Sequence, residues 1–349
     1  MTLILVTGGL GFIGSHTCLS LLEQNFEVLI IDSLINSKKE TYEKLKQLVI
    51  HYKISSENIF FRKGDIRDTK WLSSIFAEFQ SLGNPIEAVI HFAGLKSANE
   101  SIFHPLKYWD ANVNTTISLL RTMDEFKCNN IVFSSSATIY KPDNNKTLLE
   151  CFPKQPINPY GNSKLTIERL LNDLYNSNKG KWNIINLRYF NPVGCHSSGL
   201  IGENPNGIPN NLFPIIVKIL KSKNDKLSIF GNDWPTKDGT CVRDYIHVVD
   251  LAESHIAALK FILNNEPQIL NLNVGTGLGT SVLEIVNHFN RFEEVDLKYE
   301  FTHRRIGDAA FVVANNKLAL EKLNWSPKRN IIDICRDTLN WITKTNLQD

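Results

Sequence analysis

Short runs of apolar residues recur along the first half of the chain, each followed by a longer amphipathic or polar segment. Apolar and polar positions do not alternate within the runs, which is typical of strands buried on both faces. The spacers have the length of crossover helices, which join neighbouring parallel strands. The sequence therefore predicts a parallel sheet wound β-α-β from the runs 3–6, 28–31, 59–61, 88–90, 131–133 and 184–187.

Two spacers have a helical pattern, at 105–127 and 159–178, and Pro159 stands near a helix start, where proline is tolerated. From 191 to 211 the chain is dense in Gly, Pro and Asn, which predicts a long loop. Helices are then expected at 212–221, 249–263 and 281–292, and strands at 227–230 and 269–274. We expect an α/β fold: a Rossmann-type doubly wound parallel sheet at 1–190 and a smaller α/β substrate domain at 191–349, with part of 243–275 packing back on the first domain.

The charge balance argues against two classes of partner. Lys and Arg number 38 and Asp and Glu 36 in 349 residues, so the net charge of +2 gives no field that attracts nucleic acid or an anionic membrane. No stretch is apolar for long enough to cross a bilayer, and the N-terminus lacks the basic region of a signal peptide. The 6 cysteines form no C-x-x-C pair, so we expect no disulfide framework, no metal site and a cytoplasmic protein.

The first predicted strand ends in a glycine-rich turn. The segment Thr7-Gly8-Gly9-Leu10-Gly11-Phe12-Ile13-Gly14 satisfies G-x-G-x-x-G and precedes a helical apolar pattern. Glycine is needed there because the turn is tight, because the backbone approaches a pyrophosphate, and because the helix N-terminus then meets that negative charge. In this context the turn predicts a dinucleotide site.

Polar residues end the next predicted strands. Asp32 ends the second, where a carboxylate accepts hydrogen bonds from the hydroxyls of the adenosine ribose and repels a 2′-phosphate, so NAD is favoured over NADP. Asp65-Ile66 and the segment 91–96 follow later strands, at the edge where open α/β sheets bind ligands. We expect His91 itself to pack in the core rather than to catalyse.

The fifth predicted strand ends in three serines, and a later helix carries Tyr160 and Lys164 four residues apart. This spacing puts both side chains on one face, so the ammonium is expected to lower the pKa of the phenol and to orient the ribose. Tyr160 then becomes a usable base, and Ser136 is expected to share the proton of the substrate hydroxyl. Tyr-x-x-x-Lys alone carries little weight, but Ser, Tyr and Lys in this order after a dinucleotide motif are far more specific.

The chain resembles the extended short-chain dehydrogenases/reductases, and within them the UDP-glucose 4-epimerase family, over nearly its whole length. The resemblance rests on the strings TGGLGFIGSHT (7–17), GDIR (64–67), HFAGLK (91–96), FSSSAT (133–138), YGNSK (160–164), LRYFNPVG (187–194), GIPNNL (207–212), IFGNDW (229–234), VRDYIHV (242–248) and LNW (323–325).

This resemblance implies an isomerase that retains NAD+ and interconverts UDP-glucose and UDP-galactose through a 4-keto sugar that rotates in the site. It also implies a homodimer paired through the helices at 105–127 and 159–178. The implied cofactor-binding residues are Gly8, Gly11, Phe12, Ile13, Gly14, Asp32, Asn36, Ser37, Asp65, Ile66, Phe92, Ala93, Gly94, Lys96, Ser134, Tyr160, Lys164 and Phe190. The implied substrate-binding residues are Lys96, Ser136, Thr138, Tyr160, Asn191, Asn211, Leu212, Ser228, Ile229, Phe230, Arg243, Arg305, Asp308 and Val312.

Three positions depart from the family pattern. Asn162 replaces the middle lysine of YGKSK, and Ala111 replaces an asparagine on the cofactor side. Val312 stands where enzymes restricted to the glucose and galactose forms carry tyrosine. A smaller side chain there leaves volume near the C2 substituent of the sugar, so we hypothesise that UDP-GlcNAc and UDP-GalNAc are also substrates; the alternative is that valine merely packs.

Other functions remain open at this point. A nucleotide-sugar 4,6-dehydratase shares NAD, Tyr and Lys but needs a further acid and base, typically an Asp-Glu pair, where Ala137 and Thr138 stand. An enzyme acting on UDP-glucuronate as decarboxylase or epimerase would be separated by a uronate assay. A non-catalytic NAD-binding regulator is disfavoured because Ser136, Tyr160 and Lys164 are all present.

Overall fold

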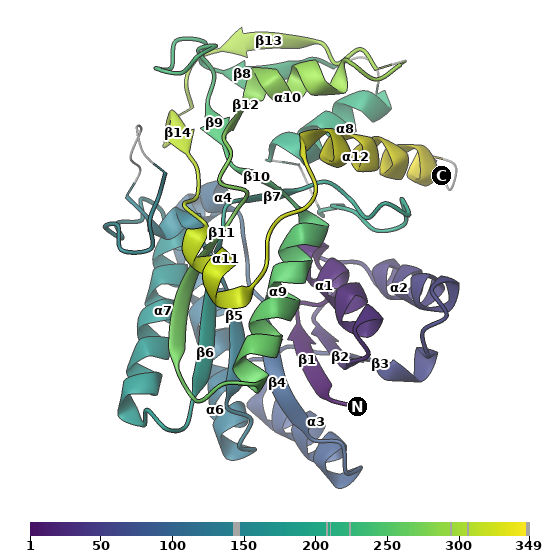
Figure 1. The fold of residues 1–349 in the computed structure, drawn as a ribbon, viewed down its shortest axis with the longest axis vertical. Helices are drawn as coiled ribbons and strands as arrows, with labels where there is room; N and C mark the ends of the chain where they lie inside the picture. The colour runs from purple at the N-terminus through teal and green to yellow at the C-terminus, as the bar shows by residue number, and fades with distance from the viewer. Residues whose placement is uncertain are drawn as a thin grey trace.

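One parallel sheet contains all the apolar runs of the first half of the chain (Figure 1). The computed structural model describes residues 1–141, 147–206, 209, 211–222, 225–293, 295–305 and 307–346. The sheet has seven strands in the order β11-β6-β5-β4-β1-β2-β3, and every neighbouring pair is parallel. The predicted Rossmann-type sheet is therefore confirmed. Its strands are β1 (Leu3–Thr7), β2 (Glu27–Asp32), β3 (Ile59–Lys63), β4 (Ile86–His91), β5 (Asn130–Ser136), β6 (Asn183–Tyr189) and β11 (Ile269–Val274).

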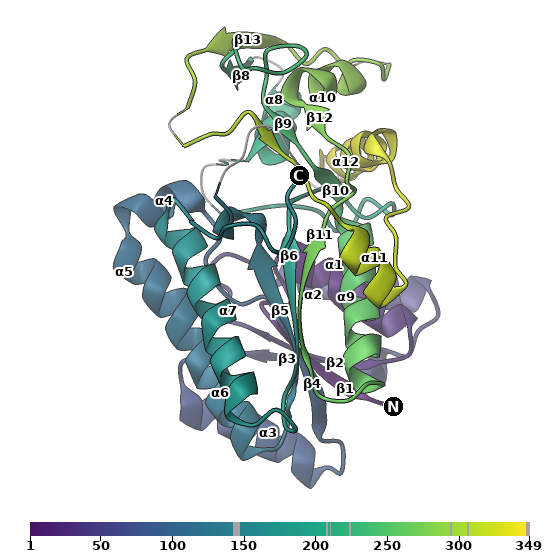
Figure 2. The same cartoon turned by 60° about the vertical axis from the view of Figure 1, so that its left-hand side comes forward.

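Helices cover both faces of this sheet (Figure 2). Successive strand residues point to opposite faces, so Ile4 and Val6 enter one buried cluster while Leu3 and Leu5 enter the other. Both clusters exclude water, which accounts for runs without alternation. On one face lie α1 (Phe12–Glu23), α2 (Glu40–His51) and α9 (Val248–Leu263), and on the other α3 (Thr69–Ser81), α6 (Thr115–Glu125) and α7 (Pro159–Ser177).

The helix expected at 105–127 is not continuous. A short α4 (Ala98–Phe103) precedes α5 (Pro105–Tyr108), and a π-helical turn, η2 (Trp109–Asn114), separates α5 from α6. Within that turn the carboxamide of Asn112 accepts a hydrogen bond from Leu95 N (2.7 Å) and donates one to Ser163 Oγ (2.9 Å). The wider turn thus places an amide against the neighbouring loop and α7, which periodicity alone does not reveal.

The rest of the chain forms small sheets and helices above the carboxyl ends of the large sheet (Figure 1). Its own apolar cluster includes Phe213, Ile229, Tyr245, Phe289 and Ile334. In contrast, β11 and α9 belong to the large sheet and its cover, because β11 pairs with β6 and α9 packs on α1. A domain boundary near residue 190 stays a prediction. The further elements are η1 (Ser56–Asn58), η3 (Ala137–Ile139), β7 (Asn191–Val193), α8 (Leu212–Ser222), β8 (Leu227–Phe230), β9 (Val242–Arg243), β10 (Tyr245–His247), β12 (Thr280–Ser281), α10 (Val282–Phe289), β13 (Tyr299–Thr302), β14 (Phe311–Val312), α11 (Lys317–Leu323) and α12 (Ile331–Asn346).

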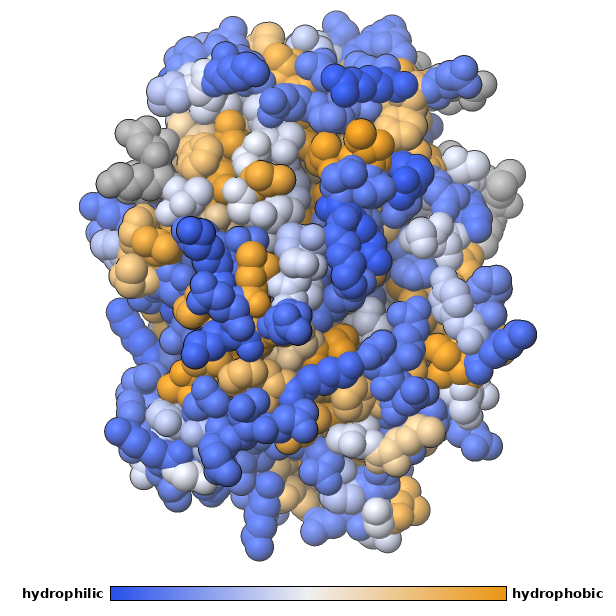
Figure 3. Space-filling model, in the orientation of Figure 1, coloured by the Kyte–Doolittle hydropathy of each residue, from blue (hydrophilic) through white to orange (hydrophobic). Residues whose placement is uncertain are grey.

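Hydrophilic side chains dominate the face of the molecule shown in Figure 3. Among the helices of the described ranges, none is both long and apolar enough to cross a membrane. All 6 cysteines lie within those ranges and are free thiols. Residues 207, 208 and 210 of the predicted long loop lie outside the described residues.

A buried carboxylate connects three segments at the junction of the two halves. Asp244, between β9 and β10, accepts hydrogen bonds from Thr276 N (2.8 Å), Gly277 N (3.0 Å) and Ala314 N (3.2 Å). The hydroxyl of Thr276 donates a further hydrogen bond at 2.7 Å. The side chain thereby fixes the turn after β11 and the segment after β14 in place.

We predict that Asp244→Asn lowers the free energy of unfolding by about 1.5–3 kcal/mol, because the NH2 group of an amide would face backbone N–H donors. Thermal unfolding followed by circular dichroism measures this change. The matched control is Asp296→Asn, whose side chain is largely exposed and which should leave the midpoint unchanged. Equal midpoints for Asp244→Asn and the wild type would contradict the role given to these hydrogen bonds.

Candidate active site

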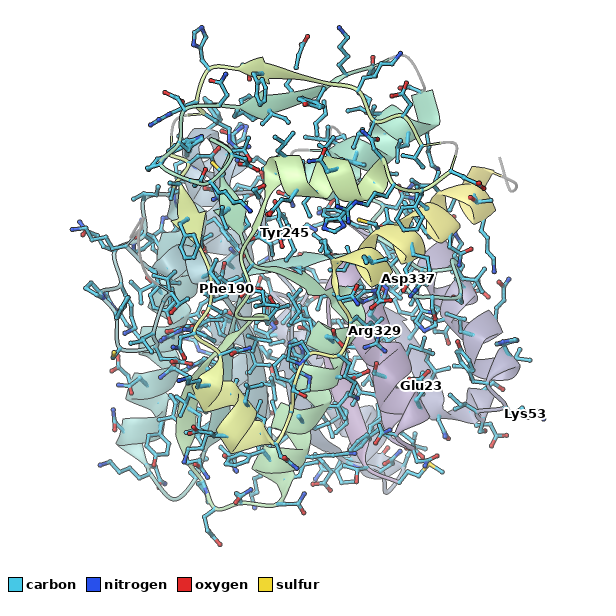
Figure 4. All side chains as sticks on the ribbon, turned by 45° about the horizontal axis from the view of Figure 1, so that its top comes forward. Glu23, Lys53, Phe190, Tyr245, Arg329 and Asp337 are labelled. Carbon is cyan, nitrogen blue, oxygen red and sulfur yellow. The ribbon has the colours of Figure 1, made fainter. Side chains whose placement is uncertain are left out.

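A cavity of about 570 Å³ lies between the carboxyl ends of the sheet strands and the upper half of the molecule. Residues of both halves line it, among them Phe190 and Tyr245, which are labelled in Figure 4. Every residue for which the sequence predicted a catalytic, cofactor or substrate role lies on its wall except Val312. Positions spread from Gly8 to Asp308 are thus brought to one place.

At one end of the cavity, a glycine turn lets a phosphate group approach the backbone closely. Gly8 has φ +67°, and a Cβ there would lie 2.9 Å from Ala93 N. A Cβ on Gly14 would lie 2.4 Å from Gly8 O, so neither position accepts a side chain without movement. Helix α1 begins after Gly11, and no side chain caps it there. An uncapped helix N-terminus above a glycine turn fits the pyrophosphate of the predicted dinucleotide.

Asp32 lies at the next position along this wall and is almost fully buried. Its carboxylate accepts hydrogen bonds from Leu10 N (3.0 Å), Leu34 N (2.9 Å) and Ser37 Oγ (2.7 Å). These three donors fix the orientation of the carboxylate: Oδ1 accepts two of the hydrogen bonds and Oδ2 accepts one, so Oδ2 keeps a lone pair for a further donor. The geometry fits recognition of a ribose hydroxyl.

Asp65 also lies on the wall, but its carboxylate is paired with Arg67. The Nε–Oδ1 distance is 3.1 Å and the Nη2–Oδ2 distance 2.6 Å, and this pairing lowers the pKa of Asp65. Arg67, Lys38 and Lys44 line the same end of the cavity, although the sequence did not single them out. Surface lysines and arginines are so common that only their position in the fold reveals them.

Ser136, Tyr160 and Lys164 meet in the middle of the cavity. Tyr160 is at the start of α7, and Pro159 occupies the first helical position while Asn158 caps the helix through Gly161 N (2.8 Å). Lys164, one turn later, is 5% exposed and donates from Nζ to Ser134 O at 2.7 Å. Ser136 accepts a hydrogen bond from Thr138 Oγ1 at 2.9 Å and is also hydrogen bonded to Tyr160.

The expectation that Lys164 lowers the pKa of Tyr160 is wrong for the chain alone. Burial raises the pKa of the phenol, and the hydrogen bond to Ser136 opposes this. The Lys164 Nζ atom lies 6.0 Å from the centre of the Tyr160 ring and is directed to the Ser134 carbonyl. Burial lowers the pKa of Lys164 itself to about 7, so a large share of the amine is uncharged at neutral pH. A further positive charge is needed to make Tyr160 acidic.

The opposite end of the cavity carries two arginines that share one carboxylate. Asp308 Oδ1 lies 2.9 Å from Arg305 Nη2 and 3.7 Å from Arg243 Nη2. Arg243 also donates to Ala309 O (2.7 Å), while Arg305 lies over the ring of Phe230 at 5.4 Å. Two guanidinium groups with one carboxylate leave a net positive charge, and this suits a nucleotide diphosphate. Asn191, Asn211, Leu212, Ser228 and Ile229 line the same end.

Two of the departures from the family pattern have clear positions. Ala111 lies on the cofactor side of the wall, and the neighbouring Asn112 is directed away, to Leu95 and Ser163. Val312 pairs in register with Arg243 and packs against a small apolar cluster that contains Phe190. Val312 therefore lies beside the cavity and not on its wall, and it adjoins the cavity through the cluster that contains Phe190.

Besides Arg67, Lys38 and Lys44, sequence reasoning missed the cavity residues Tyr189 and Glu203. Tyr189 ends β6, and its hydroxyl lies 2.8 Å from His255 Nε2 on α9. Its position at the carboxyl end of a parallel strand is the sequence feature that could have identified it as a cavity residue. Glu203 forms an ion pair with Lys96 (2.6 Å) across the cavity, and a separation of 107 residues gave no signal for it.

His91 lies in the core, as predicted, between Thr7 Oγ1 (2.7 Å) and Thr116 Oγ1 (3.0 Å). Burial lowers its pKa to about 3, so it is neutral. Within the described ranges no three His, Cys, Asp or Glu side chains are arranged to hold a metal ion.

Comparison with known proteins gives consistent results. Residues 5–338 match the family described as GDP-mannose 4,6 dehydratase. The chain is 46% identical over 338 residues to the UDP-glucose 4-epimerase of Bacillus subtilis (strain 168), covering 97% of this chain and 96% of that protein.

Two crystal structures are similar along the whole chain. UDP-glucose 4-epimerase from Stenotrophomonas maltophila, with bound NAD and formylated UDP-arabinopyranose, is 40% identical with a TM-score of 0.93 and 100% of both chains covered. The enzyme from Bifidobacterium longum in complex with NAD+ and UDP is 39% identical with a TM-score of 0.90 and 99% of both chains covered. The chain belongs to the UDP-glucose 4-epimerase family of the extended short-chain dehydrogenases/reductases.

Proposed function

We propose that the chain is an NAD-dependent isomerase that interconverts UDP-glucose and UDP-galactose at C4. The observation that carries the proposal is the meeting of Ser136, Tyr160 and Lys164 midway along a cavity with a dinucleotide cradle at one end and an arginine pair at the other. That order puts the reacting sugar between two nucleotide sites. Family relatives named for this reaction, with NAD in solved structures, support it.

Different residues of the chain carry out proton transfer, cofactor orientation and diphosphate binding. When bound, NAD+ supplies the hydride acceptor for C4 and a positive charge near the phenol. Tyr160 removes the proton from the C4 hydroxyl and later returns it, with Ser136 holding that hydroxyl and Lys164 orienting the ribose. Arg243 and Arg305 hold the diphosphate, so the 4-keto sugar is free to rotate while the nucleotide stays bound.

The site lacks the additional acid and base that a 4,6-dehydratase needs. Elimination needs an acid and a base beyond Ser136, and those positions hold Ala137 and Thr138, whose hydroxyl donates to Ser136. A 4,6-dehydratase is therefore disfavoured despite the name of the matching family. Assay with a UDP-uronate distinguishes the remaining enzymatic alternative.

The homodimer is also part of the proposal. Phe103 is 71% and Leu106 82% exposed, and Ile102 and Trp109 are exposed beside them. These side chains belong to α4, α5 and η2, which lie next to α7 at the edge of the molecule (Figure 2). A second copy would cover them. A cytoplasmic location, supported by the free thiols, completes the proposal.

Purified protein, without added NAD, should convert UDP-galactose to an equilibrium mixture with UDP-glucose. Tyr160→Phe should slow this conversion by about 10²–10⁴-fold, because the phenylalanine cannot take the C4 proton. Chromatography of the two sugars over time measures the rate, and release of NAD by denaturation checks its content. The control Asn162→Ala, exposed on the same helix, should retain activity; full activity in Tyr160→Phe would contradict the mechanism.

Lys164→Met should make the nucleotide-free chain more stable while turnover is lost. Because burial lowers the pKa of Lys164 to about 7, the unfolded chain binds more protons than the folded chain between about pH 7 and its ordinary pKa of 10.5. Burial of Lys164 therefore lowers the free energy of unfolding by its full amount below pH 7, and this destabilisation disappears as the pH rises towards 10.5. Thermal unfolding midpoints from pH 6 to 10 should show a stabilisation by Lys164→Met that shrinks with pH; a constant difference would refute it.

We also propose that the N-acetylated UDP-hexoses are substrates, on the basis of the small side chain at Val312. Val312→Tyr should reduce turnover of UDP-GalNAc more than that of UDP-galactose, because the added ring would press on the cluster around Phe190, which lines the cavity. Rates for both sugars, measured side by side, provide the comparison. An equal loss of both activities would refute the volume argument.

A further inference from the structure

Helix α7 carries a third polar side chain in line with Tyr160 and Lys164. Glu168 follows Lys164 by four residues, so the three side chains lie one above the other on one face of the helix. Glu168 does not line the cavity: it is 5% exposed and lies beneath the active site. The catalytic face of α7 thus continues into a buried polar contact.

The partner of Glu168 is Arg188 on β6, which is 1% exposed. Arg188 Nε donates to Glu168 Oε1 at 2.9 Å, and Nη2 donates to Oε2 at 2.7 Å. Its Nη1 donates to Tyr140 Oη (2.8 Å) and to Glu150 O (3.1 Å). The next two residues of β6 and its loop, Tyr189 and Phe190, line the cavity.

The same carboxylate also contacts β5. Ser135 Oγ donates to Glu168 Oε1 at 2.5 Å. Together with the Lys164 hydrogen bond to Ser134 O and the Tyr160 hydrogen bond to Ser136, this gives three consecutive residues of β5 that hold α7. The position of the helix along and around its axis is therefore set by polar contacts with fixed geometry.

Stability alone does not require such a pair. Two charges removed from water lose hydration, and apolar residues of the same volume are often equally or more stable in their place. What a bidentate pair provides is a defined geometry, since two parallel N–H···O bonds fix both planar groups. A displacement of about 1 Å at a reacting group is enough to cost roughly 10²-fold in rate.

We propose that Glu168 and Arg188 are positioning residues for the epimerisation: their ion pair holds α7 against β5 and β6 so that Tyr160 and Lys164 are aligned with the reacting sugar. The inference rests on the proposed function, because it assigns value to the alignment of Tyr160. Neither residue touches the cavity, so both act only through the helix and strand they connect.

The test is the double variant Glu168→Met with Arg188→Met, which removes both charges together and leaves no unpaired one. Its thermal midpoint should equal or exceed that of the wild type. NAD content and KM for UDP-galactose should stay unchanged, whereas kcat should fall by 10-fold or more. The rate at which reduced nicotinamide absorbance appears in a single turnover should fall by the same factor, which a merely structural role would not produce.

A milder variant covers the case in which the double variant fails to fold. Ser135→Ala removes the contact between β5 and Glu168 and leaves the ion pair intact, and it should lower kcat about 3–10-fold at constant KM. The matched control is Asp250→Leu with Arg329→Met, a second ion pair (2.5 Å) that connects α9 to the segment before α12 and not to α7. This control should leave kcat unchanged.

The outcomes separate the two proposals. Wild-type kcat in a folded double variant, or in Ser135→Ala, would overturn the positioning role while the epimerase function stands. A wild-type protein that converts no UDP-hexose would overturn the proposed function, and this inference with it. If kcat of the Glu168/Arg188 double variant fell only as far as that of the Asp250/Arg329 control, the positioning role would also be overturned, because the loss would then follow from the removal of either ion pair.

Discussion

A lysine buried against the end of a parallel strand is the constraint on which the active site depends. Lys164 loses hydration at its position, and the Ser134 carbonyl accepts a hydrogen bond from its Nζ atom in place of water. An ammonium with one hydrogen bond retains donors for further groups, and the cavity is the direction in which they are available. The chain alone thus leaves Lys164 near its titration point, and a bound ligand decides its charge.

The same logic applies to Tyr160. In the chain alone, burial makes the phenol a weaker acid, and the hydrogen bond to Ser136 compensates only in part. A base of this kind is inactive until an adjacent positive charge arrives with the cofactor. Under the proposed function, proton removal by Tyr160 and hydride acceptance would therefore require the same bound molecule, so neither step would proceed without the other.

Much of this arrangement follows from local pattern. Strands buried on both faces produce apolar runs such as 3–6 and 184–187, and Gly8 and Gly14 are needed because a Cβ would meet backbone. Contacts between distant residues are different in kind. The pairing of Lys96 with Glu203 and that of Glu168 with Arg188 depend on tertiary packing, and neither spacing nor composition identifies them. The π-turn at 109–114 and the placement of Val312 off the wall are likewise set by neighbouring segments.

The side chains at the two ends of the cavity differ in how firmly their contacts hold them, and this difference suits a sugar that must rotate within the site. At the cofactor end, Asp32 is fixed by three donors and the glycine turn by backbone contacts. At the other end Arg305 is half exposed and has Asp308 and the Phe230 ring as neighbours. A long, partly exposed side chain keeps rotamer freedom until a diphosphate orders it. In the proposed function, the binding energy gained at that end would hold the nucleotide, while a hexose between Tyr160 and Arg243 would keep room to present either face to the cofactor.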